Sequence, residues 1–360
     1  MLQFAGIADF PELLSKDMRY RLSIVIPCYR VEPYLKRCLD ALLAQNMDGI
    51  QLVCVNDGSP DNSLRILREY ESRCPNVTVI DQENRGAWQA RRRGIEAAEG
   101  EYIGFADPDD RVQPGFAEKL YTAAQASGAD IVVCGFDRID GETGKRCSRE
   151  MTAFPYREFS LRQEPGLLLE VNTALWNKIF RTGLAKSMPE FSSAPRCFED
   201  LFAFQLLCKN ADRICFVPDS LVCYTVRKDS MMGSIRQEDI PEIRTAMLQL
   251  RGLFLYRQPG YASFPDALAF LHLGISLMHR VSGFGDTTLK KTLRENTAFL
   301  DAEFPGWRTS PFLCLSYVLR HRGANRKVFL VRQIYRLHLE RFFFRVYNSM
   351  ILRLGIDIKW

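Results

Sequence analysis

The N-terminal third of the chain alternates short apolar runs with amphipathic segments. Four runs rich in β-branched residues are typical of buried strands, and they cover residues 22–26, 51–55, 77–80 and 102–105. The segments between them carry apolar residues at helical spacing, and they span residues 35–43, 61–70 and 86–98. Alternating strands and helices predict a parallel sheet with helices on its faces.

Three of these predicted strands lead directly into segments that carry proline, tyrosine or acidic and amide side chains. The first leads to residues 27–29, the second to Asn56 and Asp57, and the fourth to residues 107–110. In sheets of this kind, ligands bind beyond the carboxyl ends of the strands. We therefore expect the three segments to share one rim of the sheet and to form a ligand site.

The segment 107–110 holds three carboxylates within four residues, in the order Asp-Pro-Asp-Asp. Like charges this close repel one another, so a cation is expected nearby. Carboxylates at this density suit Mg²⁺ or Mn²⁺ shared with substrate phosphates. Taken alone, the segment leaves open an ordinary turn with solvated acids, in which Pro108 is a common turn residue.

Beyond residue 240 the strand pattern is replaced by helical spacing, which covers residues 243–254, 268–281 and 289–300. A chain of 360 residues is also long for a single hydrophobic core. We therefore expect an N-terminal extension (1–20), an α/β sheet domain (21–235) and a helical C-terminal region (236–360).

The net charge of +5 is concentrated at the C-terminal end, where residues 320–360 hold ten lysines and arginines against two acids. Residues 326–337 are apolar nearly all round and are expected to be buried. In the following helix, Arg341 and Arg345 share one face, and Phe343 and Tyr347 lie on the other. A basic, aromatic segment over 326–354 can bind an anionic membrane surface, or it can pack internally or in a dimer contact. Nucleic acid is disfavoured as a partner because the segment is so apolar.

Composition indicates the compartment. The eleven cysteines are an odd number without Cys-x-x-Cys pairs, which favours reduced thiols in a cytosolic setting. Residues 1–20 lack the pattern of a secretion signal, and no run approaches the ~18 apolar residues of a membrane span. We expect a cytoplasmic protein, with attachment to the inner face of the membrane as an alternative.

Four motif blocks follow one another in fixed order and spacing, at residues 23–35, 55–61, 83–86 and 100–110. Together they resemble the family-2 glycosyltransferases of the bacterial surface-polysaccharide type, over roughly residues 21–230. The resemblance implies a GT-A fold, with a mixed, Rossmann-like sheet that binds a nucleotide sugar. It also implies an inverting, metal-dependent transfer, most commonly from a UDP-sugar.

Family roles carry over to matching positions on the nucleotide side. By resemblance, Pro27, Tyr29 and Glu32 border the nucleobase, and Asp57 contacts the uracil or ribose. One position departs from the pattern, because Arg30 stands where the family commonly has Asn.

The resemblance also assigns the diphosphate side. Asp107 and Asp109 match the metal-and-diphosphate motif, with Asp109 as the ligand of Mn²⁺ or Mg²⁺, and Arg91 matches a donor-binding position. Arg92 replaces the usual Asn, and Asn56 replaces an Asp found in many members. Neither change removes the metal motif.

A later block, around Glu199 and Asp200, resembles the family's Glu-Asp motif, whose aspartate is the general base. These acids can equally be the acidic first turn of a helix, and both can hold at once. All four histidines lie beyond the motif region, so a carboxylate base is favoured. The resemblance places Trp176 and Lys178 near the donor sugar and acceptor, although Trp176 can equally be a core residue. It also places Glu199 in the vicinity of the acceptor or diphosphate. Arg227 can approach the diphosphate or merely flank a loop.

The sequence therefore predicts a glycosyltransferase of the hexosyl or N-acetylhexosaminyl class that acts on a glycan or polyprenyl-linked hydroxyl. A non-catalytic nucleotide-sugar-binding or scaffold protein of the same fold is the alternative. A nucleotidyltransferase is a more distant one, because the first strand is not followed by a glycine-rich loop.

Overall fold

The computed structural model describes residues 19–154, 157–188, 195–227, 235–255, 261–320 and 325–354. The chain divides into two compact units that interleave along the sequence. The first comprises Met1–Glu158, Ala174–Phe191 and Arg213–Val226, and the second comprises Phe159–Thr173, Ser192–Asp212 and Arg227–Trp360. The sequence predicts two consecutive domains, 21–235 and 236–360, whereas the two compact units interleave along the chain. The predicted domain bounds stay a prediction.

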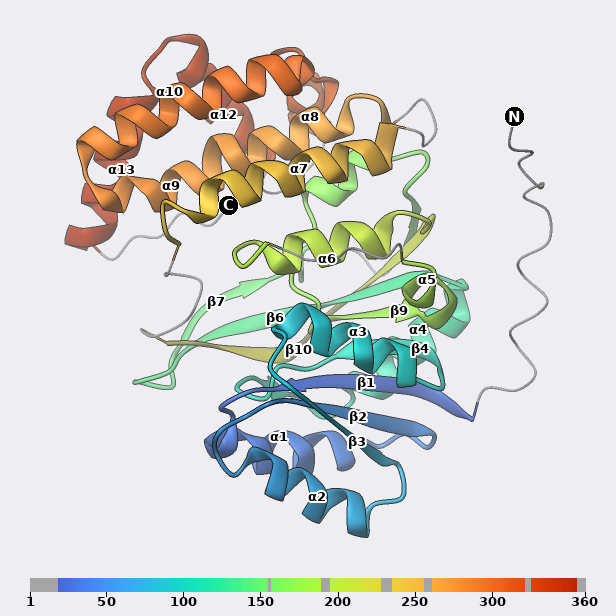
Figure 1. Ribbon diagram of the computed structural model, residues 1–360. Helices are drawn as coiled ribbons and strands as arrows, with labels where there is room; N and C mark the ends of the chain where they lie inside the picture. The colour runs from blue at the N-terminus through green and yellow to red at the C-terminus, as the bar shows by residue number, and fades with distance from the viewer. Residues whose placement is uncertain are drawn as a thin grey trace, which may run out of the picture. The chain divides into compact units, whose positions relative to one another are not determined.

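The first unit is built on a 10-stranded sheet with the order β3-β2-β1-β4-β9-β6-β10-β5 (Figure 1). Outside this order, β7 pairs with β6 and β8 pairs with β10. Strands β1 to β4 are parallel, and β9 is antiparallel to both β4 and β6. The predicted fold class, a mixed α/β sheet followed by a helical region, is confirmed. The strands are β1 (Tyr20–Cys28), β2 (Ile50–Asp57), β3 (Val77–Gln82), β4 (Gly100–Phe105), β5 (Arg111–Val112), β6 (Ile131–Asp140), β7 (Arg146–Glu150), β8 (Glu158–Ser160), β9 (Lys178–Arg181) and β10 (Arg213–Val226).

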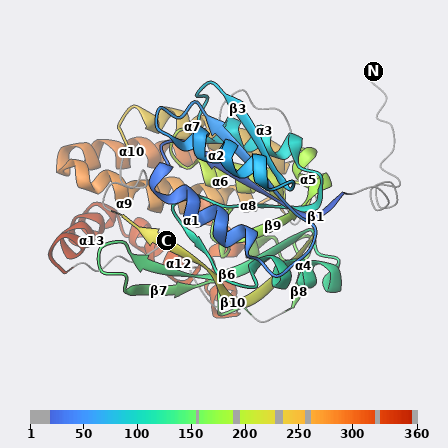
Figure 2. The same cartoon turned by 90° about the horizontal axis from the view of Figure 1, so that it is seen from below.

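Helices cover both faces of this sheet. They are α1 (Glu32–Leu43), α2 (Ser63–Arg73), α3 (Ala87–Ala97), α4 (Phe116–Ser127) and α5 (Thr182–Lys186). The apolar stripes of α1, α2 and α4 join Ile24 and Ile26 in one core, with α1 and α2 in front of the strands in Figure 2. Helix α3 covers the opposite face, where Val25 points. It packs closely there, because a Cβ on Gly94 would lie 2.2 Å from Val25 Cγ1.

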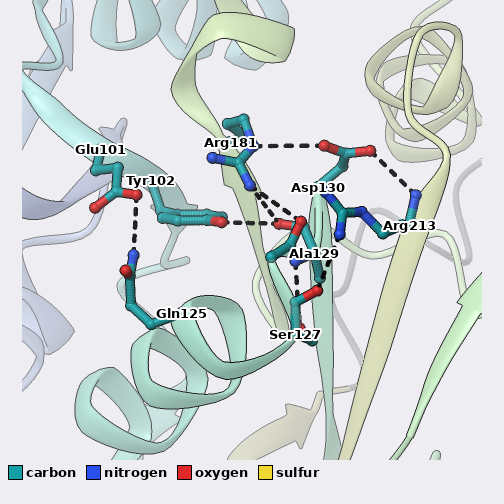
Figure 3. Close-up of polar contacts among 9 residues, drawn as sticks. Glu101, Tyr102, Gln125, Ser127, Ala129, Asp130, Arg181 and Arg213 are labelled. Atoms are coloured by element: carbon teal, nitrogen blue, oxygen red, sulfur yellow. Dashed lines mark hydrogen bonds and ion pairs between the residues drawn. The ribbon is translucent and has the colours of Figure 1, made fainter. Parts of the chain in front are cut away.

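Polar contacts close the end of the sheet at which β4 begins (Figure 3). The Asp130 carboxylate accepts hydrogen bonds from Arg181 Nε (3.4 Å) and from the backbone N–H of Arg213 (3.0 Å). The Tyr102 hydroxyl donates to the carbonyl of Ala129 at 2.8 Å. These bonds connect β4, β9 and β10 at the rim opposite the acidic residues 107–110.

The second unit is helical, as predicted for the chain beyond residue 240. Its helices are α6 (Glu199–Cys208), α7 (Asp239–Leu255), α8 (Phe264–Ala269), the π-helix Phe270–Ser276, α9 (Leu277–Val281), α10 (Asp286–Glu303), α11 (Leu315–Arg320), α12 (Asn325–Arg336) and α13 (Glu340–Leu354). Short 3₁₀ helices lie at Pro165–Leu169, Ser282–Phe284, Pro305–Arg308 and Pro311–Leu313. In its core, the rings of Phe270 and Trp307 stack with centroids 4.7 Å apart.

The sequence analysis expects no segment that is long and apolar enough to span a membrane. One helical segment of the structure contradicts this expectation. The continuous helical stretch Phe264–Phe284 passes that test by length and composition. However, 67% of its most apolar window is buried inside the structure. Its role as the core of the helical unit therefore explains its apolar composition.

The sequence predicts that the segment 326–337 is buried on all sides. In the structure, helix α12 is buried on one side only. Val328, Val331 and Tyr335 are buried, whereas Leu330 is 60% exposed. A helix on the surface of a helical unit buries one stripe and leaves its other residues in solvent. The prediction of a buried segment over 326–337 is therefore wrong.

Helix α13 packs internally through residues of both predicted faces. Arg341 donates from Nε to the Asp286 carboxylate at 3.0 Å, so the arginine face contacts the start of α10. Phe344 and Tyr347 are buried, while Phe342 and Val346 are exposed. The helix buries an arc that lies between the two predicted faces.

Candidate active site

The three strand-end segments predicted to share a rim do so. In the sheet register, Cys28 at the end of β1 pairs with Asn56 near the end of β2. On the other side of β1, Val25 pairs with Phe105, and the N–H of Ala106 donates to the Val25 carbonyl at 3.1 Å. The loops that follow β1, β2 and β4 therefore leave the sheet along one edge.

The acidic segment is a closed turn. The N–H of Asp110 donates to the carbonyl of Asp107 at 3.0 Å, with Pro108 at the second position, where turns favour it. The carboxylate of Asp110 is buried and accepts the N–H of Thr225 at 2.9 Å, so this acid fixes the turn to β10. Asp107 and Asp109 are only half-buried, which leaves two of the three carboxylates accessible for chemistry.

Helix α3 brings a predicted arginine to the turn. Arg91 is buried, and its guanidinium donates to Asp107 Oδ1 at 3.2 Å. The structure therefore joins two residues that the sequence analysis had assigned to the donor site separately. Of the neighbouring arginines, Arg92 is half-buried and Arg93 pairs with Glu96 on the exposed side of the helix.

The electrostatic effect of the acidic turn reaches helix α1. Burial, followed by the negative charges of Asp107 and its neighbours in the turn, raises the pKa of the Cys38 thiol to about 12. Arg37 donates to the backbone carbonyl of Asp109 at 3.4 Å. Sequence reasoning missed Arg37, because nothing in its spacing along α1 indicates which loop its side chain meets.

The acidic turn fits a divalent metal shared with a ligand. Among the residues that the structure describes, no three or more His, Cys, Asp or Glu side chains form a complete protein-only metal site. Magnesium typically uses one or two carboxylates and completes its coordination with phosphates and water. Asp107 and Asp109, separated by one residue on a half-buried turn, are a donor set of that kind, so metal binding stays a prediction that this geometry permits.

Asp57 has a structural task that the sequence did not indicate. Its buried carboxylate accepts hydrogen bonds from Gln82 Nε2 (2.7 Å), Arg85 N–H (2.8 Å) and Gly86 N–H (2.8 Å). It therefore fixes the loop that leads into α3 and its arginine. Its contact with a nucleotide stays a prediction.

Asn56 shows why an amide suits this position. Its Nδ2 donates to Asp81 Oδ1 at 2.7 Å, so an aspartate here would place two carboxylates in contact. Its Oδ1 is buried and has no hydrogen-bond partner within the described part of the chain.

The loop after β1 carries the predicted nucleobase residues. Pro27 is half-buried in β1, while Tyr29 is exposed, and the guanidinium of Arg30 lies 5.3 Å from the centre of the Tyr29 ring. Arg30 has a φ of 54°, a left-handed conformation that Asn tolerates better than most residues. The family habit of Asn at this position thus matches the backbone.

Glu32 and Asp61 join this loop to the loop after β2. Glu32 accepts hydrogen bonds from the backbone and side chain of Asn62, which lower the pKa of Glu32. Asp61 accepts the N–H groups of Glu32 (3.1 Å) and Ser63 (3.0 Å). Burial opposes ionisation of Asp61, but hydrogen bonds from Ser59 and Ser63 outweigh it and lower its pKa to about 2. Asp61 thus bridges the two loops through its bonds to the N–H groups of Glu32 and Ser63.

Trp176 and Lys178 lie in the interior of the first unit. Trp176 is buried, parallel to Tyr224 (5.4 Å between centroids) and edge-on to Phe136 (4.8 Å), as the core alternative predicted. Lys178 is fully buried, and its Nζ donates to the carbonyl of Ala174 and to Asn177 Oδ1. A role near the acceptor stays a prediction for both. Arg227, half-buried directly after β10, likewise keeps its predicted role untested.

Glu199 and Asp200 form the first turn of α6 in the second unit, and both are half-buried. The preceding residue, Phe198, has a φ of 65°, which is a strained conformation for a bulky side chain. The guanidinium of Arg280 lies 4.7 Å from its ring centre. Strain of this kind collects at functional sites, and the sequence carries no signal for it.

Comparison with known proteins identifies the chain. Residues 23–185 match the family described as Glycosyl transferase family 2. The glycosyltransferase GlyG of Streptococcus pneumoniae is 33% identical over 225 residues, which cover 59% of this chain and 72% of GlyG. The chain belongs to glycosyltransferase family 2. EpsH of Bacillus subtilis is 29% identical over 282 residues, covering 76% of this chain and 81% of EpsH.

The solved structures agree with this family-2 assignment at the level of fold. Residues 1–349 of S. aureus TarS, crystallised in complex with UDP, superpose with a TM-score of 0.65 at 18% identity. The match covers 94% of this chain and 93% of the TarS chain, so it includes the helical region as well as the sheet. The predicted family and enzyme class are confirmed, and the nucleotidyltransferase alternative is set aside.

Proposed function

We propose that this family-2 glycosyltransferase transfers a hexose or N-acetylhexosamine from a UDP-sugar to a hydroxyl group, with inversion at the anomeric carbon. The observation that carries the proposal is the acidic turn at the rim of β1, β2 and β4, with Arg91 bound to Asp107. Diphosphate recognition needs a cation and hydrogen-bond donors close to the carboxylates that share its metal. The turn and α3 supply both kinds of group.

Asp109, with Asp107, would hold the Mn²⁺ or Mg²⁺. When bound, such an ion stabilises the negative charge that develops on the departing diphosphate. Arg91 would donate to the diphosphate oxygens and keep Asp107 oriented.

On the nucleotide side, the exposed ring of Tyr29 offers a flat surface against which a planar base can stack. TarS has been crystallised with UDP and with UDP-GlcNAc in the same fold, which supports a uridine donor for this chain.

Asp200 is proposed as the general base. The acceptor hydroxyl would give its proton to the Asp200 carboxylate while its oxygen forms a bond to the anomeric carbon. The bond from that carbon to the diphosphate breaks, and UDP leaves with the electron pair. His272 competes poorly for this role, because burial lowers its pKa to about 3 and makes it a weak base.

The acceptor is proposed to be a glycan or lipid-linked glycan hydroxyl. The supporting observation is the name of a similar protein. The minor teichoic acid biosynthesis protein GgaB of Bacillus subtilis is 36% identical over 136 residues. That match covers 36% of this chain and 15% of GgaB, so the acceptor rests on a shared segment only.

The proposal is tested by UDP release from a panel of UDP-sugars, with and without acceptor glycans. Asp200→Asn should reduce kcat by at least about 100-fold and leave the donor KM within about threefold, because a base acts in the transition state. Glu199→Gln, one residue earlier in the same turn, is the matched control and should keep more activity. Equal turnover by Asp200→Asn and the parent enzyme would remove the base assignment.

A further inference from the structure

The connection between α12 and α13 exposes large apolar side chains. Leu337 is 66% exposed, Leu339 49% and Phe342 68%. Three such residues within six positions, here called the 337–342 turn, depart from the polar composition that loops normally have. A protruding group of this kind indicates an interaction site.

The turn is closed by hydrogen bonds rather than open. The N–H of Leu339 donates to the carbonyl of Ile334 (3.0 Å), and the N–H of His338 donates to the carbonyl of Tyr335 (3.2 Å). His338 has a φ of 55°, and this left-handed residue ends α12 as in a Schellman-type cap. The N–H of Phe343 then donates to the Leu339 carbonyl to begin α13.

Neighbouring core residues hold the turn in this position. The Tyr335 hydroxyl donates to the carbonyl of Gly274 at 2.6 Å, and Phe344 is completely buried. These anchors lie just before and just after the exposed residues, so Leu337 and Phe342 cannot turn inward without displacing core side chains. Their exposure is built into the helical unit.

The surroundings of the turn are basic. Between residues 325 and 354, Glu340 is the single acidic residue of the sequence. Lys327, Arg336 and Arg345 are exposed on α12 and α13. Arg341 and Arg345 contribute less positive charge than Lys327 and Arg336, because both pair with Asp286.

We propose that the 337–342 turn is a membrane-contact element that inserts its apolar side chains at the interface of an anionic lipid surface. Exposed leucine and phenylalanine side chains enter the boundary between headgroups and acyl chains, and nearby lysine and arginine bind lipid phosphates. A second copy of the chain is a poorer occupant. A two-fold contact through this turn would bring like charges together.

Vesicle sedimentation with the full chain tests this directly. Vesicles of phosphatidylcholine alone are compared with vesicles containing about one third phosphatidylglycerol, using the parent and a Leu337→Ser, Leu339→Ser, Phe342→Ser variant. Binding should require the anionic lipid and fall at least tenfold in the variant. The matched control is Leu315→Ser with Leu319→Ser, which removes apolar side chains that are 54% and 66% exposed on α11 and should keep the binding.

Thermal midpoints of both variants should match the parent, because the substituted side chains are exposed. Absence of binding to anionic vesicles, or equal loss in the two variants, would overturn the proposal. Self-association of the parent that the 337–342 variant abolishes would also overturn it and would make a second copy the occupant.

Discussion

Arg30 adopts an unfavourable, left-handed backbone conformation in the loop after β1. Its φ of 54° lies in the left-handed region, where Asn and Gly are the usual residues. The backbone is fixed there because the N–H of Arg30 donates to Ser59 Oγ at 2.8 Å. The compensating contact is with the ring of Tyr29, next to the proposed nucleobase position.

Arg30→Asn should therefore stabilise the fold by roughly 0.5–1 kcal/mol, because Asn adopts left-handed backbone at lower cost. Urea denaturation of the two proteins measures the difference. A destabilised variant would show that the contact between Arg30 and Tyr29 outweighs the strain.

For single residues, the sequence predicted which side chains belong to the site better than it predicted which groups those side chains contact. Asp109, Asp107 and Arg91 could be assigned from motif position, and the pairing of Arg91 with Asp107 followed once α3 was placed. The hydrogen bonds that occupy Asp57, and the left-handed Phe198, were not predictable. They depend on how two loops meet, which spacing along one segment does not encode.

The loops after β1 and β2 behave as one element because Asp61 and Glu32 bridge them. The Asp61 pKa of about 2 lies below its ordinary value of about 3.9. A carboxyl group whose pKa is depressed by folding contributes stability that is present above its unfolded pKa. That contribution is lost as the pH falls from about 4 towards 2.

Asp61→Asn should consequently lower the free energy of unfolding by about 1 kcal/mol at pH 6, a value reduced for solvent screening. The difference between the two proteins should shrink as the pH approaches 2. Denaturation curves at pH 6, 4 and 2.5 measure it. A difference that stays constant across this range would show that the loss is packing rather than charge.

Element prediction succeeded where periodicity and burial coincide. The four predicted strands appear as β1 to β4, and the three predicted helices between them appear as α1 to α3. Strands β5 to β10 and helices α4 and α5 were not predicted. Helix α12 was misjudged because apolar residues around a short helix do not reveal which stripe is covered. Trp176 shows the same ambiguity, since an aromatic residue at the start of a strand suits both a core and a binding site.

In the first unit as a whole, the two ends of the sheet have different tasks. One rim carries the acidic turn and the loops proposed to bind the donor. At the opposite rim, the Asp130 carboxylate accepts hydrogen bonds from Arg181 of β9 and from the backbone of Arg213 in β10 (Figure 3). Separation of this kind lets the fold be stabilised at one rim while the other keeps accessible carboxylates.

Asp130→Asn should thus lower stability by about 1 kcal/mol, through the weakened bonds to Arg181 and the Arg213 backbone. Donor affinity should stay within about twofold of the parent value. Thermal denaturation and nucleotide titration on the same preparation check both. A large loss of donor affinity at unchanged stability would contradict the division between the two rims.

The most direct test of the account is a calorimetric titration of UDP with and without Mn²⁺, on the parent enzyme, Asp109→Asn and Asp130→Asn. The metal should tighten UDP binding at least tenfold in the parent and in Asp130→Asn, and this gain should vanish in Asp109→Asn. Equal UDP affinity with and without the metal in the parent would contradict the proposed metal-assisted donor site, and so would an undiminished gain in Asp109→Asn.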